Sequence, residues 1–225
     1  AQAAYVDPLE LTQAPEAQVR GMKVGKLANA ILLRRELDVA AQLTSTAVLT
    51  NSETLSGTGQ WSDFTNSDPI NAIAVKADSL PRRPNVFLAG RDVITKLRQH
   101  PKVLAAIQYT QTGGMAPLSA LAALFEVDRM IVGDAFKDTA LEGLTATKSR
   151  IWGKDAILAY VDPSPPSPLM DQPTLGYLPT LSAAGLTMQT YLARDPMRGT
   201  GAGVEFIKVE TTYGILVSAV SMAYL

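Results

Sequence analysis

Two glycine-containing segments of this sequence are similar to nucleotide-binding motifs. The segment GMKVGKL, from Gly21 to Leu27, has the composition of a phosphate loop, but its glycines are one residue too close and Leu27 stands where Ser or Thr would hold magnesium. Because it lies within a helical pattern, we interpret it as part of a helix that tolerates two glycines. The segment from Gly199 to Gly203 lacks the preceding strand and the following helix of a dinucleotide fingerprint. We expect a flexible turn there.

The chain has one histidine, His100, and no cysteine. His100 lacks the second histidine that an HExxH zinc site requires, and Pro101 follows it, so we expect a residue at a helix end rather than a base. The absence of cysteine excludes disulfides and thiolate chemistry. No G-x-S-x-G elbow is present for a serine triad. We therefore predict no catalytic residue, no cofactor-binding residue and no metal ligand.

Carboxylate chemistry stays open at the level of sequence. Five acidic residues could converge in space: Asp63, Asp68, Glu126, Asp128 and Asp134. Their spacing does not demand a site, and solvated or capping roles are more common for such side chains. A small carboxylate-dependent hydrolase is therefore an alternative hypothesis. It requires several of these side chains to meet in one pocket.

The charge balance argues against a general nucleic-acid binder. The chain has 20 basic and 21 acidic residues, so there is no global source for phosphate attraction. The clusters Arg34-Arg35 and Arg82-Arg83 favour solvated faces or salt bridges between subunits. No apolar run reaches the roughly 18 residues of a membrane span, and the first ten residues do not resemble a signal peptide. We expect a protein that neither spans a membrane nor is exported.

The longest helical signal runs from Pro15 to Ser45. Pro15 suits a first helical position, and Glu16 places negative charge at the positive end of the helix dipole. Apolar residues follow at three- and four-residue spacings, which predicts one broad apolar face: Val19, Met22, Leu27, Ile31, Leu37, Ala40 and Leu43. Such a helix would span about 45 Å, more than a small domain needs. We expect a neighbouring molecule along it, and bending or fraying near Gly21 and Gly25.

A compact mixed region follows a polar loop at 46–65, in which Trp61 and Phe64 are expected to pack onto the body or onto a neighbour. Helical spacing, capping residues and prolines predict helices at 68–80, 91–100, 101–107 and 117–125. Short apolar runs predict buried strands at 85–89, 129–133 and 157–161.

The remaining segments are mostly extended or irregular in this interpretation. Residues 3–11 are expected to form an approach rather than an element, residues 139–149 a loop, and residues 162–168 a proline-rich rim. Residues 177–192 are ambiguous. The C-terminal part contains two strand-like runs, VEFIKVETT and YGILVSAVSMAY, and we expect the second to be core, beneath the long helix.

Several local phrases, in their order and spacing, resemble the major capsid proteins of tailed bacteriophages. The phrases are Gln60-Trp61-Ser62-Asp63, Ser67-Asp68-Pro69-Ile70, Arg83-Pro84-Asn85, Leu97, His100-Pro101, Ile107-Gln108-Tyr109-Thr110, Val132-Gly133-Asp134-Ala135 and Ile151-Trp152-Gly153-Lys154. The resemblance implies an α+β fold of the Hong Kong 97 type, with a long spine helix, a peripheral-domain sheet and a mixed α/β axial domain. The implied division is 1–67 for the peripheral part, 68–191 for the axial domain and 192–225 for the returning peripheral strands.

The resemblance also implies a function. The chain would be a coat protein that self-assembles through capsomers, hexamers and pentamers of itself, into an icosahedral head enclosing double-stranded phage DNA. Scaffold, portal and cement proteins would be further partners, and DNA would be contacted non-specifically. It would be a virion protein assembled in the host bacterial cytoplasm.

Two observations qualify this interpretation. Family members carry an N-terminal arm and an extended loop before the spine helix, whereas about fourteen residues precede Pro15 here and the first residue is not Met. We therefore expect a truncated or processed chain. An encapsulin-like shell that encloses protein cargo is the nearest alternative, beside the hydrolase.

Overall fold

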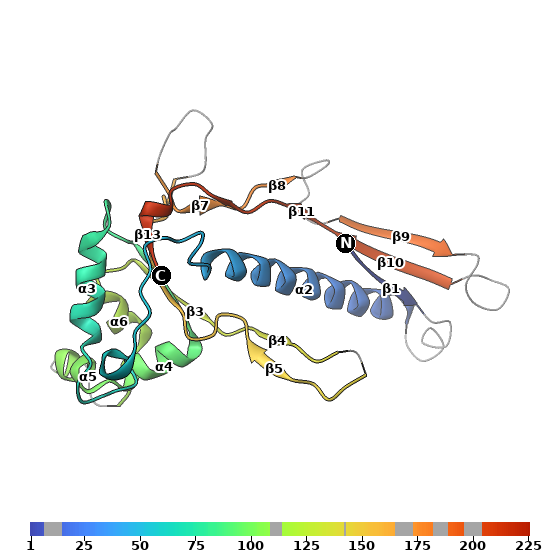
Figure 1. Ribbon diagram of the computed structural model, residues 1–225. Coiled ribbons are helices and arrows are strands. Elements are labelled where there is room, and N and C mark those ends of the chain that lie inside the picture. The colour runs from blue at the N-terminus through green and yellow to red at the C-terminus, as the bar shows by residue number, and fades with distance from the viewer. Residues whose placement is uncertain (7–14, 109–113, 142, 165–172, 182–188, 196–203) are drawn as a thin grey trace. The chain divides into compact units, whose positions relative to one another are not determined.

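The computed structural model describes residues 1–6, 15–108, 114–141, 143–164, 173–181, 189–195 and 204–225 (Figure 1). The chain divides into two compact units. Unit 1 comprises Ala1–Val39 and Leu178–Leu216, and unit 2 comprises Ala40–Tyr177 and Val217–Leu225. The chain thus passes from unit 1 into unit 2, returns to unit 1 and ends in unit 2, so each unit is assembled from two segments far apart in sequence. The described residues form a mixed α+β structure, as predicted.

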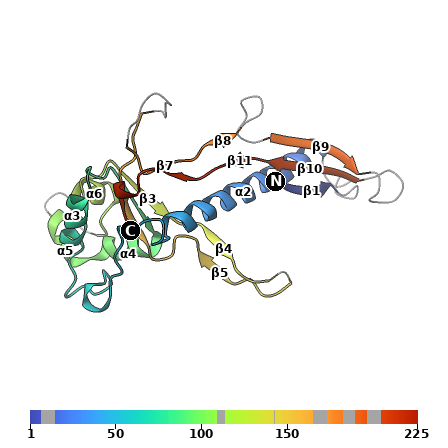
Figure 2. The same ribbon diagram turned by 45° about the horizontal axis from the view of Figure 1, so that its top comes forward.

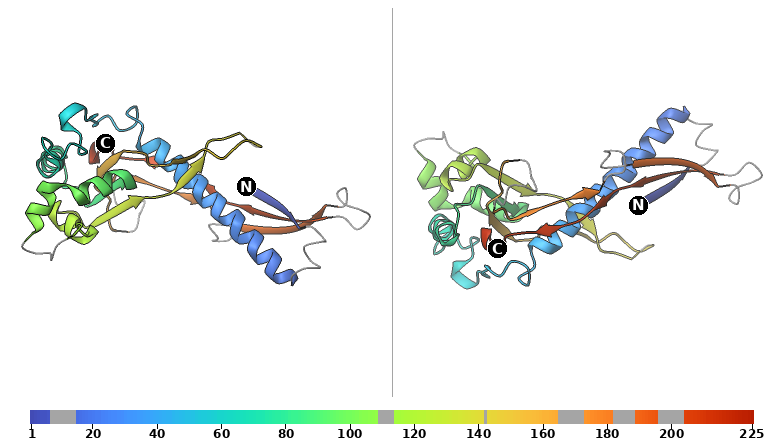
Figure 3. Two further views of the ribbon diagram at one scale, coloured as in Figure 1. Left: turned by 90° about the horizontal axis from the view of Figure 1, so that it is seen from below. Right: turned by 90° about the horizontal axis from the view of Figure 1, so that it is seen from above.

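Unit 1 is a long helix on one face of a three-stranded antiparallel sheet (Figures 1 and 3). The elements are α2 (Glu16–Leu43), β1 (Gln2–Val6), β9 (Gln189–Asp195) and β10 (Val204–Glu210). The strand order is β1, β10, β9, and Tyr5 lies opposite Phe206. The helix and sheet share one buried cluster, made by Val6, Val19, Leu27, Ile31, Ile207 and Val209. Two further short strands, β8 (Thr180–Leu181) and β11 (Thr212–Tyr213), pair with each other.

The predicted long helix is confirmed. The carbonyl of Pro15 accepts the N–H groups of Gln18 and Val19, so the proline begins the helix as expected. The predicted fraying near Gly21 is wrong for the described structure, because α2 is continuous from Glu16. The predicted apolar face is only partly correct, since Met22 is 61% exposed.

Two predictions for unit 1 need correction. The segment predicted as a mere approach contains strand β1, which pairs along its whole length with β10, about 200 residues later in the chain. Residues 7–11 of that prediction lie outside the described residues. The run beneath α2 is the first C-terminal run, β10, and not the second. In β10, Ile207 and Val209 turn their side chains to the helix, whereas the second run is divided into short pieces.

Unit 2 contains a four-stranded mixed sheet with helices packed against it. Its strand order is β13 (Ala223–Tyr224), β6 (Ala156–Ala159), β2 (Val86–Gly90), β3 (Arg129–Gly133), and only β2 and β3 are parallel. The helices are α3 (Pro69–Ser79), α4 (Arg91–Gln99), α5 (Pro101–Ile107) and α6 (Leu118–Leu124). These elements match the predicted helices and strands of the mixed region. Short strands β7 (Gly176–Tyr177) and β12 (Leu216–Val217) also pair, and short 3-10 helices form at 57–59 and 220–222.

The predicted loop at 139–149 is part of a β-hairpin. Strands β4 (Phe136–Asp138) and β5 (Lys148–Arg150) pair with Lys137 opposite Ser149. The sequence of these strands has few apolar residues, and the pairing is set by backbone hydrogen bonds, which leave no hydrophobic pattern to detect. The predicted rim at 162–168, the ambiguous segment at 177–192 and the predicted turn at 199–203 lie partly or wholly outside the described residues.

Candidate functional site

His100 lies at the junction of α4 and α5 and is completely buried. Its Nδ1 accepts the backbone N–H of Lys102 at 3.2 Å, and its Nε2 is 3.0 Å from the hydroxyl of Ser67. The Ser67 hydroxyl donates to the carbonyl of Asp63 at 2.6 Å, so it accepts from Nε2. The ring is therefore neutral, with its proton on Nε2. Burial lowers the pKa of His100 below its ordinary value, which agrees with this state.

The same network ties the polar loop to the helices. Asp63 accepts the backbone N–H groups of Thr65 and Asn66 and the side-chain amide of Asn66, and these bonds lower the pKa of its carboxyl. Asp68 caps α3 by accepting the N–H of Asn71, and this bond is the main cause of the lowered Asp68 pKa. The loop is thus held to α3 and α5 by capping residues rather than by catalytic ones.

Aromatic residues of the loop are packed as predicted. The ring of Phe64 meets His100 edge-on, with centroids 5.6 Å apart, and the Lys96 ammonium lies 5.6 Å from the Phe64 ring. Trp61 packs against the main core of unit 2. Its indole nitrogen is buried and finds no hydrogen-bond acceptor among the described residues.

A second junction joins β3 to the segment around Trp152. A Cβ on Gly133 would lie 2.2 Å from Cδ1 of Trp152, and a Cβ on Gly90 would lie 2.2 Å from the carbonyl oxygen of Gly153. Only glycine allows this approach. The following residue, Asp134, pairs with Arg91 at 2.7 Å and Arg150 at 2.8 Å. These two bonds hold the pKa of Asp134 at about 2.

The carboxylates that sequence analysis singled out are not brought into one pocket. Asp63 and Asp68 cap turns, Glu126 pairs with Arg83, and Asp134 pairs with Arg91 and Arg150. The backbone N–H of Asp128 donates to the carbonyl of Asn85 at 2.9 Å. Within the described part of the chain, no three acidic or histidine side chains gather in a way that could hold a metal ion. This arrangement does not support the carboxylate-hydrolase alternative.

The arginine clusters make contacts inside the chain. Arg34 pairs with Asp38 one helical turn later at 3.0 Å, and the Arg82 guanidinium lies 4.4 Å from the Tyr160 ring. Arg83 pairs with Glu126. Arg34, Arg82 and Arg83 therefore have partners within the chain. Among the helices that the structure describes, none has the length and apolarity needed to cross a membrane.

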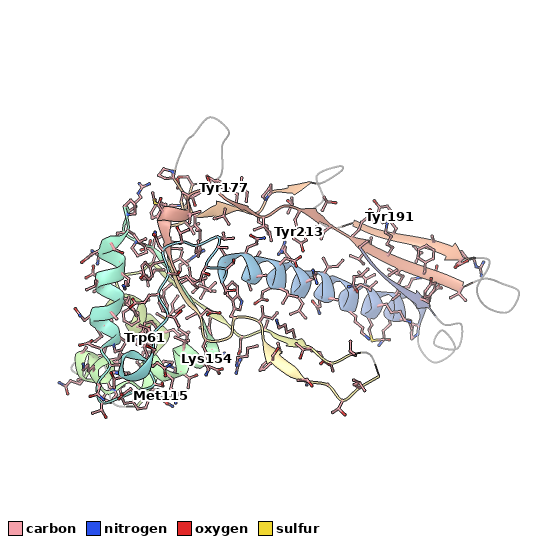
Figure 4. The ribbon with its side chains drawn as sticks, viewed as in Figure 1. Trp61, Met115, Lys154, Tyr177, Tyr191 and Tyr213 are labelled. Atoms are coloured by element: carbon pink, nitrogen blue, oxygen red, sulfur yellow. The ribbon has the colours of Figure 1, made fainter. Side chains whose placement is uncertain are left out.

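Unit 2 has a pocket of about 520 Å³ whose lining comes from several segments. The polar loop contributes Trp61 and Thr54, the helix α3 contributes Ile73, and the sheet contributes Phe87 and Leu158. Trp61 and Lys154 are labelled in Figure 4. Sequence reasoning missed this pocket, since its walls are dispersed from residue 44 to residue 225. No local sequence pattern indicates a pocket of this kind.

The β4–β5 hairpin extends away from the helices of unit 2 (Figure 2), and several of its apolar side chains are exposed. Leu141 is 77% exposed and Leu144 is 68% exposed, and Phe136 is also exposed. Sequence reasoning missed this feature too. The sequence offered two leucines in an otherwise small and polar segment, and leucines in a loop are not informative by themselves.

Comparison with known proteins identifies the kind of molecule that these units form. A model of the family described as phage major capsid protein E matches residues 45–166, more than half of the chain. The major capsid protein of Pseudomonas phage JBD67 is 36% identical over 145 residues, covering 63% of this chain and 47% of that protein. The major capsid protein of Burkholderia phage BcepMu is 32% identical over 138 residues, covering 59% and 43%. The matched region is thus less than half the length of these curated relatives.

Solved structures agree at the level of the fold. A phage-related protein from Bordetella bronchiseptica RB50 is similar with a TM-score of 0.76 and 21% identity, covering 99% of this chain and 73% of that one. A putative capsid protein of a prophage of E. coli CFT073 has a TM-score of 0.52 and 13% identity, covering 100% and 71%.

The predicted resemblance to phage major capsid proteins is therefore confirmed at the level of the family, whose members are structural proteins rather than enzymes. The matched residues include both junctions described above, at His100 and at Trp152. This chain belongs to the phage major capsid protein E family.

Proposed function

We propose that this chain is a coat subunit that self-assembles through hexameric and pentameric capsomers into an icosahedral head enclosing double-stranded phage DNA. The observation that carries the proposal is the family match at residues 45–166, which nearly coincides with the first segment of unit 2, Ala40–Tyr177. The matched residues thus make up most of one compact unit with its own core, as a domain does.

The same proposal assigns the fold to the Hong Kong 97 type. Helix α2 is the spine helix, the α2 and β1–β10–β9 layer is the peripheral part, and the mixed sheet of unit 2 with its helices is the axial domain. The proposed sequence limits are 1–67, approximately 68–191 and 192–225, and β9 (Gln189–Asp195) crosses the second boundary. The shared core of α2 and β10 supports the first assignment, because it joins the spine to returning strands.

The partners follow from the container role. Other copies of the chain are the main partner, with scaffold, portal and cement proteins as further ones, and the assembled protein is located in the virion after assembly in the host cytoplasm. The formal charge of -1 gives no global attraction for phosphate, which suits a container better than a sequence-specific reader of DNA.

The test is to express the complete coding sequence that contains this chain, sediment the lysate on a gradient and image the heavy fractions by negative-stain electron microscopy. Closed icosahedral shells or regular capsomers are the expected result. A product that stays monomeric at varied salt and concentration, even with the phage scaffold protein co-expressed, would overturn the proposal. Shells that contain protein cargo and no DNA after infection would favour the encapsulin-like alternative.

A further inference from the structure

We propose that His100 is an acid-sensitive latch within unit 2. A second proton on its ring releases the first turn of α5 from the loop at 63–67, while the four-stranded sheet of the unit stays folded. The latch consists of His100 and its two bonded partners, Ser67 on the loop side and the backbone N–H of Lys102 on the α5 side. The proposal concerns a local opening of the fold and does not depend on the coat function.

The bonding around the ring has no place for a second proton. A backbone N–H can only donate, so Nδ1 must be unprotonated to accept the N–H of Lys102. The Ser67 hydroxyl gives its own proton to the carbonyl of Asp63, so Nε2 must keep its proton to bond to Ser67. A second proton therefore goes to Nδ1, where two donors would face each other. The protonated ring cannot keep its bond to α5.

Helix α5 depends on this bond at its first turn. The helix has only seven residues, and helices of this length are unstable by themselves. Pro101, at its first position, has no N–H, and His100 is its N-cap. The carbonyl of His100 also accepts the N–H of Leu104 at 3.0 Å. Besides these bonds, the fully buried side chain of Val103 holds the turn in place.

Two charged side chains of opposite sign lie near the ring. Lys102 on α5 pairs with Asp68, the N-cap of α3, at 3.2 Å. Burial is the main cause that lowers the pKa of His100, Lys102 lowers it further, and Asp68 opposes both. Because the side chains of this ion pair are partly exposed, they do not replace the solvation that a buried imidazolium would lose.

The loop and α4 complete the surroundings of the ring. The Asp63 carboxylate is occupied by Thr65 and Asn66, and its carbonyl, bonded to Ser67, acts to raise the His100 pKa. On the α4 side, the ammonium of Lys96 lies over the Phe64 ring, which meets His100 edge-on.

Linkage gives the direction and the size of the effect. When the turn is open, the ring contacts water and has its ordinary pKa near 6.5, whereas the closed form has a lower pKa. Below about pH 6.5 the open form therefore binds more protons than the closed form. The ratio of open to closed molecules rises about tenfold for each pH unit, and it levels off at the pKa of the closed form.

Hydrogen exchange of the complete protein, resolved to single amides, measures this opening. The protection factor of the Lys102 amide, which corrects for intrinsic exchange, is expected to fall about tenfold per pH unit from 6.5 to 5. The matched amide is Asn71, which is bonded at 3.2 Å to the Asp68 carboxylate. That bond is the main cause of the lowered Asp68 pKa, so the carboxylate stays ionised in this interval. The Asn71 protection factor should stay constant.

Urea below the denaturation midpoint separates local opening from global unfolding. Global unfolding responds to urea in proportion to the surface it exposes, whereas the opening of one turn responds little. At pH 5, urea is expected to accelerate exchange in β2 and to leave exchange at Lys102 unchanged. Equal protection factors and equal urea responses of β2 and Lys102 would show that only the global unfolding is linked to the proton, which would overturn the latch.

The variant His100→Asn removes the proton and keeps a cap. An asparagine at the N-cap accepts a backbone N–H of the first turn and does not titrate. The Lys102 protection factor of this variant should stay constant from pH 7 to pH 5. A constant protection factor in the wild type, or a tenfold fall per pH unit that persists in the variant, would overturn the proposal.

A second pair of variants leaves the ring in place and covers the case in which His100→Asn does not fold. Lys102→Gln keeps the backbone N–H and removes the charge that lowers the His100 pKa, so the loss of protection should level off at a higher pH. Asp68→Asn keeps a capping side chain and removes the charge that raises this pKa, so the loss should continue to a lower pH. Shifts in the same direction, or no shift in either variant, would contradict the latch.

Discussion

At the scale of the residue, most polar side chains that looked like candidates for chemistry have structural tasks. Asp63 and Asp68 cap backbone turns, and His100 joins two helices through both of its ring nitrogens. Because the His100 ring is buried and neutral, the dependence of protein stability on pH tests this structural role.

We predict that stability decreases as the pH falls from about 7 to about 5. The folded-state pKa of His100 is lowered below the ordinary value of 6.5. Below pH 6.5 the unfolded chain therefore binds more protons than the folded one, and the stability present above that pH is lost. Urea denaturation at several pH values measures the effect.

The single histidine makes the control simple. The variant His100→Gln has no titrating ring, and its amide can donate to Ser67. Its stability should be lower than wild type at pH 7 but nearly constant from pH 7 to pH 5. A wild-type stability that does not change across this interval would contradict the buried neutral ring.

A second prediction concerns the stability of the protein at acidic pH. The pKa of Asp134 is about 2 because Arg91 and Arg150 bond to it, so its contribution is present above the ordinary value of 3.8 and is lost as the pH falls toward 2. Asp134→Asn should therefore lose less stability than wild type between pH 4 and pH 2. Because Asp134 is exposed, the difference is expected to be small, and parallel acid titrations followed by circular dichroism would detect it. Identical acid profiles would contradict the assigned ion pairs.

At the scale of the element, glycines of this chain occupy two opposite environments, one open and one crowded. Within α2, a Cβ on Gly21 or Gly25 would meet nothing within 4 Å. At the end of β3, a Cβ on Gly133 would collide with Trp152, which is 4% exposed. Sequence alone cannot separate the two cases, because both glycines sit in regular elements.

We predict that Gly25→Ala stabilises the isolated chain by about 0.5–1 kcal/mol, since alanine is the better helix former. The contrasting variant Gly133→Ala should destabilise it by about 1–3 kcal/mol through overpacking against Trp152. Equilibrium denaturation of both variants provides the measurement. Equal effects of the same sign would show that the packing at β3 is not as described.

At the scale of the whole molecule, the chain has two cores that form differently. The cluster in unit 1 joins β1, α2 and β10, so it needs residues about 200 positions apart. The cluster in unit 2 is larger and is built mainly from one continuous segment. Two cores of this kind can open separately.

We predict that Ile207→Ala, at a residue 1% exposed in unit 1, costs about 2–5 kcal/mol and accelerates amide exchange in β1, β9 and β10. The matched variant Ile94→Ala, at a fully buried residue of unit 2, should instead accelerate exchange in β2, β3 and β6. Hydrogen exchange followed by mass spectrometry distinguishes these patterns. Uniform acceleration by either variant would show that the chain unfolds as a single unit.

Much of the local structure could be predicted from the sequence. The long helix, the capped helices from Pro69 to Leu124 and the strands β2, β3 and β6 all have local signals, namely proline positions, capping residues and short apolar runs. The helix-end role of His100 followed from Pro101 in the same way. The resemblance to the capsid family likewise rested on local phrases, and the family match confirms it.

Which strands pair with one another was decided only by the tertiary structure. Strand β1 was missed, and β10 rather than the later run lies beneath α2, because register and partner depend on backbone pairing between distant segments. The hairpin β4–β5 was missed for the same reason. The pocket around Trp61 is also a tertiary property, since its walls come from residues dispersed along the chain. Local sequence thus determined the long helix, the capped helices, the central strands of unit 2 and the family, whereas the strand partners, the β4–β5 hairpin and the pocket arise only when distant segments pack together.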